Sequence, residues 1–156
     1  MKKKKKVKSK KRHKLWPPQK FRTFVENTVD EIKEEHGLKD FEIKYAFATK
    51  PTPVDDDGVP KTTAATIHID PKYLDALITV YPIMVDLWKD NSQNRIREIL
   101  CHEIAHIRTD KMVRLARERY VNCEDIDTYW ETLTEIVGRL MFNVIHYKKY
   151  ARKNKK

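Results

Sequence analysis

The chain has 156 residues, a length that fits one domain with a sizeable core better than two. Hydrophobic residues make up 40% of it and charged residues 36%, which excludes a chain that is disordered throughout. The longest uncharged stretch, Ala76 to Val85, spans ten residues and contains Pro82, so the sequence predicts no membrane span.

The net charge of +10 is concentrated at the N-terminus. Residues 1–14 hold ten Lys or Arg and no acid, which leaves 23 basic against 23 acidic residues in the rest. Such a block repels itself, so we expect residues 1–14 to form a disordered basic tail, residues 15–150 the domain and residues 151–156 a basic C-terminal end. The tail suits non-specific contact with nucleic acid. Because no apolar signal segment follows it, we expect a cytoplasmic protein.

The first half of the domain predicts a helix and two strands. Apolar residues recur at helical spacing from Phe21 to His36, and Gly37 follows where a left-handed residue ends many helices. Two stretches rich in aromatic and β-branched residues, 41–49 and 62–69, predict strands joined by a long loop. Because nothing helical lies between the strands, we expect them to form an antiparallel pair.

Everything after Asp70 is expected to be helical. A helix over 73–89 would be broken or kinked at Pro82, and Asp90 or Asn91 would cap the next helix. A short helix or ordered loop is expected over 111–120, and a long final helix after Asn122. The main apolar stripe of that final helix runs through Trp130, Leu133, Val137, Leu140 and Val144. The predicted fold is therefore α+β and mostly helical, with a small antiparallel sheet.

The helix after Asn91 contains the pattern H-E-x-x-H at His102, Glu103 and His106. Residues four apart lie on one helix face, about 5 to 6 Å apart at Cβ, so two imidazoles at this spacing can share one zinc ion. Glu103 is rotated by about 100° from His102, where a general base for a water activated by the metal belongs. The structural alternative is a pair of surface histidines, with Glu103 in an ion pair with Arg95 or Arg108.

A zinc site of this kind needs a third protein ligand. His146 lies near the basic end of the last helix, too far along to be well placed. A second face of that helix carries Glu131 and Glu135, with the small residues Thr134 and Gly138 that let two helices approach closely. We expect Glu131 to bind the metal and Glu135 to accept a hydrogen bond from a ligand histidine, with the swapped roles left open. A solvent-facing acidic pair is the alternative.

The two motifs, H-E-I-A-H at 102–106 and E-T-L-T-E at 131–135, resemble those of the zincin metallopeptidases. The similarity is to the gluzincin branch, which includes thermolysin, neprilysin and small single-domain relatives in phages, prophages and archaea, and it covers about residues 62–142. It implies a zincin-like fold, zinc held by two histidines and a glutamate, and hydrolysis of a protein or peptide substrate. Arg108 departs from the family pattern, which usually has an apolar residue there.

The function expected from these features is that of a zinc-dependent metallopeptidase with Glu103 as general base. The alternative is a nucleic-acid-binding or regulatory module with a basic arm, in which the metal site is structural or vestigial. Tyr120, Tyr129 and Tyr147 are unranked candidates for stabilising an oxyanion. The two cysteines, Cys101 and Cys123, form no disulfide framework, and we expect Cys101 to be a buried, inert thiol.

Overall fold

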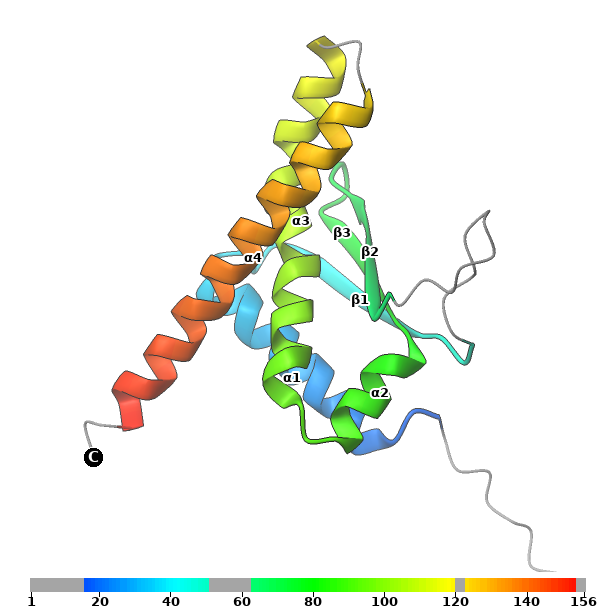
Figure 1. The fold of residues 1–156 in the computed structure, drawn as a ribbon, viewed down its shortest axis with the longest axis vertical. Helices are drawn as coiled ribbons and strands as arrows, with labels where there is room; N and C mark the ends of the chain where they lie inside the picture. Colours follow the sequence, from blue (N-terminus) through cyan, green and yellow to red (C-terminus); the bar gives the residue numbers. More distant parts are fainter. Residues whose placement is uncertain (1–15, 51–62, 120–122, 154–156) are drawn as a thin grey trace, which may run out of the picture.

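The computed structural model describes residues 16–50, 63–119 and 123–153. The predicted basic tail at 1–14 and most of the loop between the first two predicted strands lie outside the described residues. The elements in chain order are α1 (Gln19–Glu35), β1 (Glu42–Phe47), β2 (Ala65–Asp70), β3 (Asp75–Val80), α2 (Pro82–Lys89), α3 (Gln93–Arg119) and α4 (Cys123–Lys153). The fold is α+β, with a small sheet on one side of α3 and α4 laid across the same helix (Figure 1).

The sheet is mixed, with the strand order β1-β3-β2. β3 lies in the centre, parallel to β1 and antiparallel to β2, so that Ile78 has Tyr45 on one side and Ile67 on the other. The predicted antiparallel pairing of 41–49 with 62–69 was therefore wrong, because a third strand separates them.

This central strand comes from a segment that was predicted to be helical. Ala76, Ile78 and Val80 alternate along β3 and are all buried. A short apolar run fits a buried strand as well as a helix, and its β-branched residues favour the strand. Leu74, with φ of 54°, lies in the left-handed region in the turn between β2 and β3. Pro82 begins α2 instead of kinking a longer helix.

The predicted first helix is confirmed as α1, and Gly37 follows it with φ of 63°. Its apolar face packs against the sheet, α2 and α3 to form the core. The buried core side chains include Phe21, Val25, Val29 and Ile32 of α1, Met84 and Val85 of α2, and Ile96, Leu100 and Ile104 of α3.

α3 is longer than predicted, because it continues to Arg119 without the break expected near residue 111. Residues 93–119 contain neither Gly nor Pro, and strong helix formers such as Met112, Leu115 and Ala116 sustain the helix. The final helix, α4, begins at Cys123 as expected after Asn122. Within the described part of the chain, no helix is both long and apolar enough to cross a membrane.

α4 packs on α3 through the face that carries the small residues, as expected from the sequence. Thr134, Gly138 and Met141 are buried, whereas Leu140 is 60% exposed and Val144 41% exposed. Leu140 and Val144, the last two residues of the main apolar stripe, therefore do not take part in this contact. Small residues decide the contact, because they allow the two helix backbones to approach more closely than leucine side chains would.

Candidate metal centre

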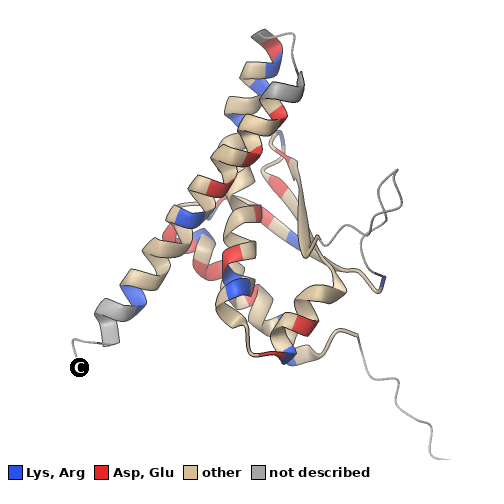
Figure 2. Ribbon diagram, viewed as in Figure 1, with Lys and Arg blue, Asp and Glu red and all other residues tan. Residues whose placement is uncertain are grey.

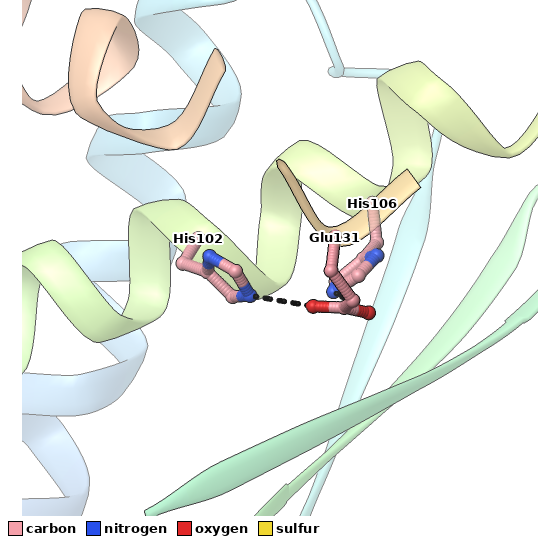
Figure 3. Close-up of side chains that lie close together, drawn as sticks. All are labelled: His102, His106 and Glu131. Carbon is pink, nitrogen blue, oxygen red and sulfur yellow. Dashed lines mark ion pairs between the residues drawn. The ribbon is translucent and has the colours of Figure 1, made fainter. Parts of the chain in front are cut away.

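Three side chains from two helices converge beside the sheet. His102 and His106 lie one turn apart on α3, and Glu131 reaches them from the facing side of α4 (Figure 3). The Nε2 atom of His102 lies 3.6 Å from Oε2 of Glu131, and Nε2 of His106 lies 3.8 Å from its Oε1. The donor atoms of the three residues all lie within 4.8 Å of one another.

This spacing fits a zinc ion. Zinc bonds to nitrogen and oxygen are about 2.0–2.2 Å long, so donor atoms around a tetrahedral ion are about 3.4 Å apart. The two nitrogen-to-carboxylate distances, 3.6 and 3.8 Å, exceed this value by a few tenths of an ångström, a difference that small side-chain rotations can remove. Two imidazoles and one carboxylate are also a donor set found at catalytic zinc sites, which keep a fourth position for water or substrate.

Glu103 lies beside these three candidate ligands, here named the ligand cluster, and is nearly buried, with 9% of its surface exposed. Burial is the main cause that raises the pKa of Glu103 to about 8, followed by the negative charge of Glu131, while a hydrogen bond with the backbone of Ile67 acts in the opposite direction. A cation held beside Glu131 would also oppose this rise, because it attracts the charged carboxylate. The geometry thus places a carboxyl group between the ligand cluster and strand β2.

His102 is fixed by a second carboxylate. Its Nδ1 atom lies 3.0 Å from Oε2 of Glu135, and Arg139 donates from Nε to the other oxygen of Glu135 at 2.7 Å. The hydrogen bond from Arg139 is the first cause that lowers the pKa of Glu135, with a smaller contribution from the bond to His102. A charged Glu135 accepts a hydrogen bond from Nδ1–H of His102, and this tautomer leaves the Nε2 lone pair free for a metal.

His106 is held by hydroxyl groups instead. Its Nδ1 atom lies 3.4 Å from Oγ1 of Thr134, which lies 3.0 Å from Oγ1 of Thr109. The indole Nε1 of Trp130 donates to the same Thr109 oxygen at 2.9 Å. Burial, followed by the nearby charge of His102, lowers the pKa of His106 to about 4, so its imidazole is neutral at physiological pH, as metal binding requires.

The contact between the two helices depends on Gly138. A Cβ atom built at this position would lie 2.8 Å from Cα of His102 and 3.1 Å from its backbone nitrogen. Real Cβ atoms do not approach backbone this closely, so any larger residue would push α4 away from the histidines. The expectation that small residues allow the close approach of the two helices is confirmed here.

Two cavities of about 520 Å³ each meet at His102 and Glu103. Thr63 and Ala65, before and at the start of β2, line both of them, so a groove follows this strand past the ligand cluster. One cavity extends toward Ile83, Leu87 and Ile99, and the other toward Arg114, Arg117 and Trp130. The site is therefore open on both sides along the edge of the sheet.

Other candidate residues are placed away from the ligand cluster. Arg95 pairs with Glu98, and Arg108 donates to the backbone carbonyl of His36, so neither is the expected ion-pair partner of Glu103. Tyr129 and Tyr147 are 74% and 72% exposed and do not line the two cavities. Tyr120 lies outside the described residues. His146 is an exposed residue near Phe142, and it is not among the described residues that converge on the cluster.

Cys101 is buried as expected, and burial raises the pKa of its thiol to about 12, with a smaller contribution from Glu31. It is therefore an inert thiol at physiological pH. No sequence pattern pointed to Thr109 and Trp130 as supports of His106. Thr109 follows His106 by one helical turn, but its role depends on the side chains that α4 brings to it.

Comparison with protein-family models, with curated proteins and with solved structures gives no match to this chain.

Proposed function

We propose that the protein is a zinc-dependent metallopeptidase. The observation that carries this proposal is the convergence of His102, His106 and Glu131, with the carboxyl group of Glu103 beside them. Two imidazoles and a carboxylate would hold the metal, and Glu135 would orient His102. Zinc supplies Lewis-acid chemistry when bound, since it lowers the pKa of water and polarises a carbonyl group.

The chain's own residues would carry the protons. Glu103 would accept a proton from the attacking water at its carboxylate and would then donate that proton to the leaving amine, which needs one to depart. Its burial between α3 and β2 supports this role, because a raised pKa makes the carboxylate a better proton acceptor. Glu135 and Thr134 would keep the Nδ1 atoms of the two histidines engaged, so that both Nε2 atoms face the same point.

An extended peptide would lie along β2. This strand is at the edge of the described sheet, and the two cavities follow it on either side of Glu103. An edge strand offers unpaired backbone N–H and C=O groups, to which an extended substrate can add as a further strand. The substrate class that fits this groove is therefore a flexible segment of polypeptide.

Replacement of Glu103 tests the proposal. Glu103→Gln keeps the size of the side chain and all three ligands but removes the proton acceptor, so we expect one zinc per chain and hydrolysis slowed by about 10² or more. Zinc is measured by elemental analysis, and hydrolysis by mass spectrometry of a peptide library. Glu118→Gln, at an exposed position of the same helix, is the control and should leave both unchanged.

Cleavage by the Glu103→Gln protein at the wild-type rate would contradict the mechanism. A wild-type protein that binds one zinc ion but cleaves no member of the library would favour a structural or vestigial site.

A further inference from the structure

The outer face of α4 carries an exposed row of large apolar side chains, here named the α4 seam. The seam consists of Tyr129, Leu133, Ile136, Leu140, Val144 and Tyr147. Leu133 is half-buried, and the other five side chains are 74%, 52%, 60%, 41% and 72% exposed in chain order. It lies on the other side of the helix from Thr134 and Gly138, which face α3.

The spacing of the seam is that of a coiled coil. Tyr129, Leu133, Ile136, Leu140 and Tyr147 follow one another at intervals of four, three, four and seven residues, so they form one straight stripe along the helix. Its exposed side chains leave on the order of 500 Å² of apolar surface in water, at the upper end for a monomer. The flanking residues would extend this area toward the roughly 800 Å² per partner of a standard interface.

The charges of α4 are divided between its two halves. Residues 123–135 contain five acidic residues and no basic one, whereas residues 136–153 contain five basic residues and no acidic one. Figure 2 shows this division along the described part of the helix, with acidic residues toward α4's N-terminus and basic residues toward its C-terminus. A partner helix that complements this pattern must have the opposite order of charges along the same direction.

We propose that the α4 seam binds the same seam of a second copy of this chain, with the two helices antiparallel. A two-fold axis near residue 138 places Tyr129 opposite Tyr147 of the partner subunit and Ile136 opposite Leu140 of the partner subunit. The seam is close to symmetric in this arrangement, with a tyrosine at each end and aliphatic residues in the middle. The acidic half of each helix then lies beside the basic half of the other.

The opposite, parallel arrangement is disfavoured by charge. It would bring together the two C-terminal ends, where residues 148–156 contain six basic residues and no acidic one. The antiparallel pair separates these ends and opposes the two helix dipoles. The inference is independent of the proposed activity, since Glu131 lies on the other side of α4 and the groove along β2 stays open.

Measurement of the molecular mass of the full chain in solution tests the proposal. We expect twice the 18.6 kDa of one chain by light scattering after size exclusion. Tyr147→Glu places an acid opposite the acidic half of the partner and should weaken dimerisation at least tenfold. Tyr73→Glu is the matched control, because Tyr73 is 66% exposed in the turn between β2 and β3 and is not part of the α4 seam, so this variant should stay dimeric.

A single-chain mass for the wild type at all concentrations would overturn the proposal, as would equal weakening by the two tyrosine variants. Leu140→Glu is a second variant in the middle of the seam. Because Leu140 is 60% exposed, this change should not unfold the chain, so a monomeric Leu140→Glu protein would reflect loss of the dimer contact. Circular dichroism of each variant checks that the helices are retained.

Disulfide trapping tests the direction of the helices. Ile136→Cys and Leu140→Cys proteins with different tags, both with Cys123→Ser, are mixed and oxidised. The antiparallel pair should give mainly the mixed 136–140 disulfide, because equal residues are offset by about 6 Å along the axis. Mainly same-residue disulfides would show a parallel pair and refute the arrangement.

Discussion

Glu131 and Glu135 are one helical turn apart on α4 and meet different atoms of His102. Glu131 faces Nε2, at 3.6 Å, whereas Glu135 faces Nδ1, at 3.0 Å. A metal bound at Nε2 would therefore have Glu131 as a direct ligand, and Glu135 would act on the opposite edge of the ring. The structure also explains why both residues read as alternatives in the sequence, since both lie on the face of α4 that meets α3.

Replacement of each glutamate by alanine separates the two roles. We expect Glu131→Ala to weaken zinc binding more than Glu135→Ala does, because the first variant loses a ligand and the second loses only the support of one, worth about 10- to 100-fold. The zinc dissociation constant is measured by competition with a chromophoric chelator. The reverse order would show that the two roles are swapped.

Thr134 contributes to the site through its hydroxyl group. If His106 presents Nε2 to a metal, its Nδ1 carries the ring proton and donates a hydrogen bond to the hydroxyl oxygen of Thr134. The hydroxyl group of Thr134 then donates a hydrogen bond to Thr109. Thr109 accepts from Trp130 as well and can donate to the backbone carbonyl of Ala105. This set of hydrogen bonds is thus compatible with the tautomer that binds metal, in which Nδ1 of His106 carries the proton.

Thr134→Val removes the hydroxyl group and keeps the shape of the side chain. We expect zinc binding to weaken by about tenfold or more, and Thr134→Ser, which keeps the hydroxyl, to remain close to the wild type. Competition with a chelator measures both. Unchanged zinc affinity in Thr134→Val, together with a lower melting temperature, would assign Thr134 a purely structural role.

At the scale of elements, the packing of α3 against α4 brings the ligands together. The sequence predicted both helices and the face with the small residues, because H-E-x-x-H and the pair Thr134 and Gly138 are local patterns. It also indicated that this face packs on α3, but it did not predict that Leu140 and Val144 of the larger apolar stripe would be exposed. That outcome depends on how closely two backbones can approach, a property that hydrophobic periodicity does not measure.

Gly138→Ala tests this contact. Alanine favours a helix by about 1 kcal/mol relative to glycine, but its Cβ would meet the backbone of His102, and overpacking of this kind costs about 1–3 kcal/mol. We expect a lower melting temperature and weaker zinc binding together. The exposed Thr132→Ala is the control on the same helix. A more stable Gly138→Ala protein with unchanged zinc affinity would show that α4 can shift freely.

The sheet was predicted less well than the helices. Strands β1 and β2 were expected from their composition, but the pairing was wrong because β3 was assigned to a helix. β3 has only six residues, and over so short a stretch the pattern of apolar residues does not distinguish a strand from a helix. The central place of β3 in the sheet depends on residues far away in the sequence, because one of its two neighbouring strands, β1, precedes β2 in the chain.

At the scale of the whole molecule, residues 1–14 account for all of the net positive charge of the chain. Their removal leaves equal numbers of basic and acidic residues, so a truncated protein has no net attraction to nucleic acid. We expect deletion of residues 1–14 to abolish salt-dependent binding to a DNA duplex and to leave peptide hydrolysis unchanged. Electrophoretic mobility shifts at several salt concentrations measure the first effect. Full DNA binding by the truncated protein would place the nucleic-acid contact in the domain instead.

The ligand atoms come from both arms of a helical hairpin, with His106 on one arm and Glu131 on the other. An ion held between them would act as a removable cross-link that ties the C-terminal arm to the body of the domain. Parting of the two arms by heat would thus release the ion, and it would also open the core, to which Met141 and Ile145 of α4 belong. Metal loss would then accompany unfolding, and chelation would lower the temperature at which the arms separate.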